Sequence, residues 1–181
     1  MPLITALAIS IGGLGALATW LFLGPLTGAL QIWAAFIAWG CFFHSGGKEP
    51  ALKSTIICTV AGAVIAWITL LVVTRTGLAD TLGLPLWAAI SVGVGVAALV
   101  LLANVPMFAT IPAMVYGFAA VAAYTLAGGK IAELTAASLA NPLVTIALSL
   151  VVGALFGYAS EKVAGALMGS PKSAGAAPAR P

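Results

Sequence analysis

Few residues in this chain could carry out acid–base, nucleophilic or metal chemistry. His44 is the only histidine, so the sequence supports neither a Ser–His–Asp arrangement nor a histidine-based metal site. Cys41 and Cys58 lie in apolar runs, without a partner at metal-ligand or redox-motif spacing. We interpret both cysteines as small packing residues. The sequence therefore predicts that the protein is not an enzyme and uses no metal or cofactor.

Charged side chains are absent from the middle of the apolar segments. Asp80 and Glu133 fall in predicted loops, Glu49 stands beside a lysine, and Glu161 ends the last apolar segment. A charge at mid-membrane costs about 2.5–3.5 kcal/mol or more, and it usually marks an ion or proton relay. This pattern argues against a proton-driven pump and against a charged substrate. It suits a neutral solute moving downhill and a structural membrane protein equally well.

Uncharged polar side chains are the candidates to line a solute path. Gln31 lies near the start of an apolar segment, where an amide needs hydrogen-bond partners. Ser10 and Ser91 occupy equivalent positions in a stretch that the chain repeats, which makes them the best pair. An ordinary interhelical hydrogen bond is the alternative for each residue. The predicted solute-path residues are Ser10, Gln31, Ser91, Thr110 and Tyr116.

Composition places most of the chain in lipid. The sequence is 62% hydrophobic and 6% charged, whereas a soluble domain carries about 25% charged residues. Seven Lys or Arg against four Asp or Glu give a net charge of +3, which is too little for nucleic-acid binding. The 181 residues leave room for about six spans of roughly 20 residues each. We therefore expect an all-α integral membrane protein with about six transmembrane helices and the lipid bilayer as its surroundings.

Turn-forming residues separate six apolar segments. Asn141 and Pro142 suit the start of the last helix, with Asn as the N-cap and Pro at the first helical position. Residues 1–165 form a single transmembrane domain, and the small, Pro-rich and basic tail 166–181 is expected to be disordered. The predicted spans cover roughly residues 3–23, 27–43, 54–74, 85–103, 107–127 and 142–160.

The chain also repeats itself. The stretch "AISIGGLGALATWLF" from Ala8 resembles "AISVGVGVAALVLLA" from Ala89. A second match places "IWAAFIAWGCFFHSGGK" from Ile32 over "MVYGFAAVAAYTLAGGK" from Met114, and a third places "AGAVIAW" over "VGALFGY". The three matches keep the same order and include Pro and Lys. Chance similarity within a chain rich in Ala, Gly, Leu and Val is the alternative.

The number of spans decides the geometry of this repeat. Each unit holds three spans, an odd number, so the second unit must enter the membrane from the opposite side. We therefore predict an inverted repeat of two three-helix units, at about residues 3–74 and 85–160. Such repeats are common in transporters and channels, where the solute site lies near the midplane between the halves.

Small residues recur every four positions in several apolar segments. Such residues lie on one helix face and let two backbones approach closely, so they mark where helices touch. These residues could mediate helix packing within one subunit, packing between subunits, or both. We expect a homo-oligomer. The predicted helix-packing residues are Gly12, Ala16, Gly62, Gly93, Ala97, Gly153 and Gly157.

The basic residues predict an orientation. With six spans, both termini lie on one side of the membrane, and the opposite side receives Arg75 and Lys130. Five basic residues against two place both termini in the cytoplasm. The five on the side of the termini are Lys48, Lys53, Lys162, Lys172 and Arg180.

Two longer stretches resemble a known family. "IPAMVYGFAA" from Ile111 and "NPLVTIALSLVVGALFGYA" from Asn141, with this length and span layout, resemble a family of bacterial inner-membrane proteins called domain of unknown function 1097. The resemblance covers roughly residues 3–165. It implies a bacterial inner membrane and a multi-span fold, and it carries no established catalytic or binding residues.

The sequence is compatible with two functions. The first is a homo-oligomeric membrane channel or facilitator for a small, largely neutral solute, with a path between the two units. The second is a non-conducting membrane scaffold or regulatory subunit for a partner protein. A polar, water-wide track between the halves would favour the first function. A continuous apolar seam, with small residues facing outward, would favour the second.

Overall fold

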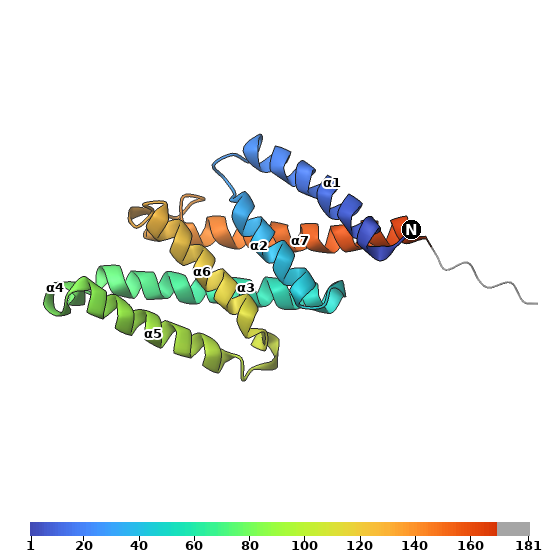
Figure 1. Ribbon diagram of the computed structural model, residues 1–181. Helices are drawn as coiled ribbons and strands as arrows, with labels where there is room; N and C mark the ends of the chain where they lie inside the picture. The colour runs from blue at the N-terminus through green and yellow to red at the C-terminus, as the bar shows by residue number, and fades with distance from the viewer. Residues whose placement is uncertain (170–181) are drawn as a thin grey trace, which may run out of the picture.

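The computed structural model describes residues 1–169 and shows that this part of the chain is all-helical, as predicted (Figure 1). Two short 3-10 turns, η1 (Pro106–Phe108) and η2 (Ala132–Thr135), precede the last two α-helices. The α-helices are α1 (Leu3–Leu23), α2 (Ile32–His44), α3 (Lys48–Arg75), α4 (Leu78–Leu82), α5 (Leu84–Leu102), α6 (Ile111–Ala127) and α7 (Pro142–Met168).

The long helices α3 and α7 run through the middle of the molecule in opposite directions (Figure 1). The shorter helices α2 and α6 pack obliquely against them. The most extensive contacts join α3 to α6 and α2 to α7, while α1 lies along α7 and α5 lies along α3. Each central pair therefore joins a helix from the first half of the chain to one from the second half.

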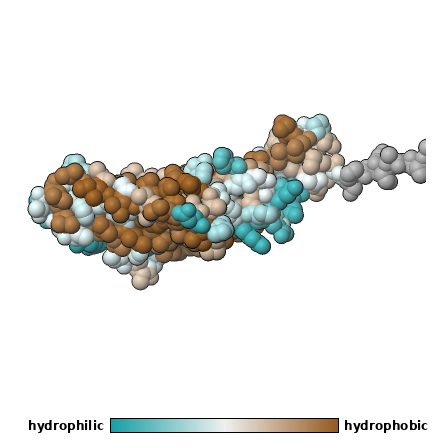
Figure 2. Space-filling view, turned by 90° about the horizontal axis from the view of Figure 1, so that it is seen from below, coloured by the Kyte–Doolittle hydropathy of each residue, from teal (hydrophilic) through white to brown (hydrophobic). Residues whose placement is uncertain are grey.

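Four helices are long and apolar enough to cross a bilayer, namely α1, α3, α5 and α7. The apolar helices α2 and α6 have 13 and 17 residues. At 1.5 Å per residue they extend about 20 and 25 Å, against a hydrocarbon core of about 30 Å. The α5 side of the molecule is largely covered by hydrophobic side chains, with hydrophilic ones gathered toward one end (Figure 2). These features indicate a membrane-embedded protein.

One predicted span starts at the wrong place. The sequence predicts a helix over roughly residues 27–43, but α2 begins only at Ile32. Residues 24–30 form turns instead, and Gly28 adopts a left-handed backbone with φ 78°. Glycine tolerates this conformation because it has no Cβ, and a helix cannot continue through it. The loss of these residues from the helix is what makes α2 short.

Two other helices extend beyond the predicted spans. α3 begins at Lys48, because left-handed Gly46 and Gly47 turn the chain sharply after α2. The carboxylate of Glu161 accepts a hydrogen bond from the backbone N–H of Lys48 at 2.8 Å, which satisfies a free amide of the first turn. α7 continues to Met168, so residues 166–168 of the predicted tail are helical. The remainder of that tail, from residue 170, lies outside the described residues.

The predicted start of α7 is confirmed. The side chain of Asn141 accepts a hydrogen bond from the backbone N–H of Leu143 at 2.9 Å, and Pro142 occupies the first helical position. The amide group of Asn141 also donates to the carbonyls of Leu134 and Ala136, at 3.0 Å each. The N-cap therefore ties the 3-10 turn η2 to the helix that follows it.

Glycines bring the central helices into backbone contact. A Cβ atom at Gly62 of α3 would overlap the backbone of Met114 in α6. In the other central pair, formed by α2 and α7, a Cβ atom at Gly153 of α7 would overlap the backbone of Ala35 in α2. Small side chains such as Ala34, Ala38, Ala63 and Ala154 fill the core around these two crossings. Lipid supplies no hydrophobic drive between helices, so such close van der Waals contact is a main source of their association.

The predicted packing residues fall into two groups. Gly62, Gly153 and Gly157 lie inside the molecule, with Gly157 against the ring of Phe42. The others lie on outward faces of the peripheral helices, where Gly12 and Gly93 have no atom within 4 Å of an added Cβ. These outward residues are Gly12 and Ala16 on α1 and Gly93 and Ala97 on α5.

This difference predicts opposite responses to the same substitution. Gly62→Ala should destabilise the protein by about 1–3 kcal/mol, because the added methyl group must push α3 away from α6. Gly12→Ala is the matched control and should leave stability unchanged or slightly higher, because its surroundings are open and Ala favours helices. Thermal unfolding of the two variants in detergent measures the effect. Equal stability of the two variants would contradict the backbone contact.

Candidate functional site

The pair formed by α2 and α6 carries polar side chains at both ends. The two helices are neighbours in space and run in opposite directions (Figure 1). At the end where α2 begins and α6 ends, Gln31, Trp33, Tyr124 and Gly128 line a cavity of about 410 Å³. This cavity combines an amide, an indole and a phenol, which are groups that can hydrogen-bond a neutral solute.

Gln31 both anchors α2 and shapes this cavity. Its backbone N–H donates a hydrogen bond to Ser149 Oγ of α7 at 2.8 Å, and Ser149 in turn donates to the carbonyl of Thr145 at 2.7 Å. The side-chain Oε1 of Gln31 accepts from the indole N–H of Trp33 at 3.3 Å. The start of α2 is thereby fixed to α7 by the backbone, while the side-chain amide group of Gln31 stays at the cavity.

Tyr116 and Thr110 lie at the opposite end of the pair, where α6 begins and α2 ends. The ring of Tyr116 meets the ring of His44 edge-on, with centroids 6.5 Å apart. Thr110 precedes α6, and its Oγ1 lies 2.6 Å from Ser54 Oγ of α3. Three of the five predicted path residues are therefore at the two ends of the α2–α6 pair.

The structure does not bring Ser10 and Ser91 together. Ser10 is buried on α1 and donates a hydrogen bond to the carbonyl of Leu7 at 3.2 Å. Ser91 is buried on α5, at a cavity between α5 and α3. Because α1 and α5 lie on opposite sides of the molecule (Figure 1), the two serines occupy separate helix contacts. Neither is among the residues that line the cavity at Gln31.

The seam between the two halves of the chain, where α2 and α3 meet α6 and α7, is filled by side chains. Buried hydroxyls within it are paired: Thr125 donates to the carbonyl of Val121 at 2.7 Å, and Ser160 accepts from the indole of Trp39 at 3.0 Å. Ala, Val, Ile and Leu residues form the rest of this core. In the described conformation the seam is therefore closed and largely apolar.

Two aromatic residues at the Gln31 cavity were absent from the predicted path, Trp33 and Tyr124. Trp33 follows Gln31 by two residues, which is close enough for the two side chains to pair. Tyr124 stands three residues before Ala127, where α6 ends. Aromatic residues beside a helix end are a sequence signal for a membrane interface, but the position of Tyr124 at the same cavity as Gln31 depends on the tertiary fold.

Charged groups gather at the helix ends. At the end where α3 begins, the Tyr158 hydroxyl donates to Glu49 at 3.4 Å and Lys162 lies 5.0 Å from the centre of the Tyr158 ring. At the other end Lys130 and Glu133 form an ion pair of 3.7 Å. Within residues 1–169 there is no group of three His, Cys, Asp or Glu side chains that could hold a metal ion.

Comparison with known proteins assigns the chain to a family. The family model described as "Protein of unknown function (DUF1097)" matches residues 8–165, which is most of the chain. The chain belongs to the DUF1097 family. Comparison with curated proteins and with solved structures found no match. For this DUF1097 protein, the candidate site is defined by its own geometry.

The link between α2 and α7 gives a test of that geometry in the DUF1097 chain. Ser149→Ala removes the acceptor for the Gln31 backbone N–H and should destabilise the protein by about 0.6–1.7 kcal/mol, the range for hydrogen bonds between membrane helices. Ser10→Ala is the matched control, because the Ser10 hydroxyl bonds only to its own helix. Reversible unfolding in mixed micelles measures both variants. Equal effects would show that the α2–α7 bond contributes nothing specific.

Proposed function

We propose that the protein is a membrane channel or facilitator for a small, largely neutral solute, built as an inverted repeat of two three-helix units. The observation that carries the proposal is an exchange of helix contacts between the two halves. If α1 is exchanged with α5, α2 with α6 and α3 with α7, the α3–α6 contact becomes the α7–α2 contact. The same exchange turns the α1–α7 contact into the α5–α3 contact.

The glycines at the crossings support this exchange. The third sequence match aligns Gly62 with Gly153, and each of them touches the backbone of a helix from the other half, at Met114 and Ala35. Inverted repeats of this kind are typical of transporters and channels, with the solute site between the units. Six membrane crossings follow from the repeat, with α2 and α6 as the short, inclined ones.

The exchange also suggests where the solute passes. It maps the α2–α6 pair onto itself, as it does the α3–α7 pair, so both pairs lie on the axis that relates the units, and α2–α6 is the one with the predicted polar residues at its ends. Gln31 stands at one end of the pair, and Tyr116 and Thr110 stand at the other. We therefore assign the path to the α2–α6 pair. Because the seam is closed in the described conformation, conduction requires α2 and α6 to move apart.

A second candidate is a non-conducting scaffold or regulatory subunit. The filled, apolar seam favours it, because a scaffold needs no route through its interior. The outward small residues favour it as well, since Gly12 and Ala16 on α1 and Gly93 and Ala97 on α5 leave room for close contact with another helix. The same faces would serve contacts between subunits of a homo-oligomeric channel.

Flux separates the two candidates. The purified protein in liposomes is challenged with water, glycerol, urea and short amides, and swelling is followed by stopped-flow light scattering. A channel should accelerate one of these solutes several-fold over empty liposomes. Gln31→Leu should lower that flux without unfolding the protein, because the bond to Ser149 uses the Gln31 backbone. Ser10→Ala, away from the pair, should conduct normally.

Permeabilities equal to those of empty liposomes for every solute would contradict the channel and favour the scaffold. Unchanged flux in a folded Gln31→Leu protein would instead keep the channel and remove Gln31 from its path.

The proposed topology is six crossings in a bacterial inner membrane, with both termini in the cytoplasm. Lys48, Lys53 and Lys162 lie at the end where α3 begins and α7 finishes, and Arg75 and Lys130 lie at the opposite end. This distribution agrees with the excess of basic residues on the cytoplasmic side.

Labelling of single introduced cysteines tests this topology. We expect Ala127→Cys, at the exposed end of α6, to react with a membrane-impermeant maleimide in intact spheroplasts, and His44→Cys to react only after the membrane is opened. The native Cys41 and Cys58 are buried and serve as the unlabelled background. Labelling of both positions from outside would contradict the assignment of α2 as a crossing helix.

A further inference from the structure

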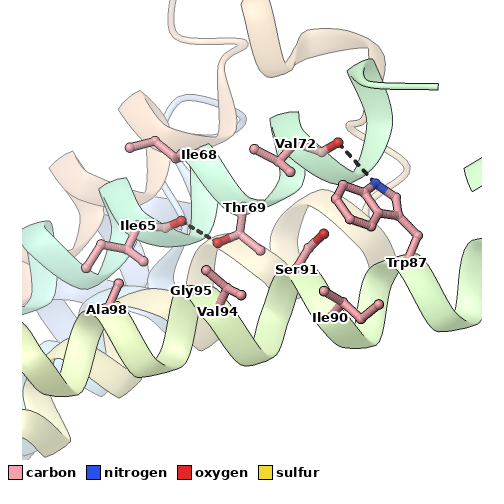
Figure 3. Close-up of a pocket in the computed structure, with 10 residues that line it drawn as sticks. All are labelled: Ile65, Ile68, Thr69, Val72, Trp87, Ile90, Ser91, Val94, Gly95 and Ala98. Carbon is pink, nitrogen blue, oxygen red and sulfur yellow. Dashed lines mark hydrogen bonds between the residues drawn. The ribbon is translucent and has the colours of Figure 1, made fainter. Parts of the chain in front are cut away.

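A second cavity lies between α3 and α5, apart from the α2–α6 pair (Figure 3). Its volume is about 310 Å³, and aliphatic side chains from the two helices make up most of its wall. Gly95 of α5 faces the side chain of Thr69 of α3, which a Cβ atom at Gly95 would overlap. This contact holds the two helices close together beside the cavity, and Ile90 and Val94 of its wall are exposed on α5.

Ser91 places an unused hydroxyl in this cavity. Its side chain is 7% exposed, and its Oγ has no hydrogen-bond partner among the described residues. Figure 3 shows the hydroxyl pointing into the space between the helices. Its equivalent in the repeat, Ser10, is bonded to its own helix. A buried hydroxyl without a partner is costly in an apolar setting, so Ser91 is available to a ligand that brings an acceptor.

The other polar groups around the cavity are already paired. Thr69 Oγ1 donates to the carbonyl of Ile65 at 2.8 Å, and the indole N–H of Trp87 donates to the carbonyl of Val72 at 3.4 Å (Figure 3). The bond to Val72 holds the Trp87 ring at the wall of the cavity, one helical turn before Ser91. The cavity therefore offers one free donor, one aromatic ring and an aliphatic wall.

We propose that this cavity binds a lipid-soluble quinone, a flat ring with carbonyl oxygens on a hydrocarbon tail. A ring carbonyl accepts the hydrogen bond from Ser91, and the ring packs on the Trp87 indole. The tail lies along aliphatic side chains such as Ile68 and Val94. Entry is from the bilayer, because Ile90 and Val94 of α5 are exposed on the lipid-facing surface. The proposal is one of binding and includes no electron transfer.

Two other occupants fit the donor less well. A helix from a second copy is about 10 Å across with its side chains, too wide to enter a cavity of about 310 Å³ and reach the buried Ser91 hydroxyl. An ordinary phospholipid carries its ester oxygens near the membrane interface. Ser91 lies seven residues after Leu84, which is about 10 Å along α5 from its first residue. A carbonyl on a ring within the hydrocarbon layer reaches this depth, whereas an unsubstituted acyl chain brings no acceptor there.

Ligand-induced stabilisation tests the proposal on the full-length protein in nanodiscs. Thermal unfolding is followed during titration with decylubiquinone, and separately with decylbenzene, which has a similar shape without the carbonyls. Decylubiquinone should raise the Tm with saturation, and decylbenzene should not. Ser91→Ala should weaken the apparent Kd roughly tenfold, the effect of losing about one hydrogen bond. Ser10→Ala is the matched control and should bind as the unmodified protein does.

Ala98→Phe provides a second variant, because it fills the cavity without touching the hydroxyl. It should fold and lose the stabilisation by decylubiquinone. Equal stabilisation by both compounds, or unchanged binding in Ser91→Ala, would overturn the proposal. Native mass spectrometry that finds a phospholipid held by the unmodified protein and lost in Ala98→Phe would also overturn it. The readout does not involve flux, so its outcome is independent of the channel.

Discussion

The structure depends on two places where helix backbones touch without side chains between them. At Gly62 the backbone of α3 meets α6, and at Gly153 the backbone of α7 meets α2. In lipid these contacts matter more than apolar burial, because the acyl chains are as apolar as the side chains they replace. Each contact joins a helix of the first half to one of the second. The remaining helices follow: α2 and α6 become neighbours, while α1 and α5 are left at the periphery.

This packing explains why the polar groups are where they are. With α2 held against α7, the backbone N–H of Gln31 reaches Ser149, and the Gln31 side chain is left at the cavity shared with Tyr124. The peripheral helix α5 has only a local contact with α3, at Gly95 and Thr69, and therefore leaves a cavity beside that contact. The central helices are tightly packed and the outer ones loosely packed. Both candidate binding regions lie where tight packing gives way.

Much of the secondary structure could be predicted from the sequence, whereas the site could be predicted only in part. The apolar run 3–23 coincides with α1 because a bilayer-length helix leaves a continuous hydrophobic signal. The late start of α2 was missed because a left-handed Gly28 gives no signal in a hydropathy pattern. Spacing by four could not separate Gly62 from Gly12, since both fit the same pattern and only tertiary packing decides which face is covered. For the same reason Ser10 and Ser91 fit the pattern equally, although Ser91 lies at the cavity between α3 and α5 and Ser10 bonds to its own helix.

The two halves of the chain hold each other through the α3–α6 and α2–α7 contacts. A protease site inserted at the exposed Gly77, between α3 and α4, tests it after the full chain has folded in the membrane. Following cleavage, the C-terminal fragment is purified by a terminal tag in mild detergent. The N-terminal fragment should be retained at a one-to-one ratio, and the thermal stability should stay close to that of the uncut protein. Separation of the fragments, each remaining helical and monodisperse, would contradict it.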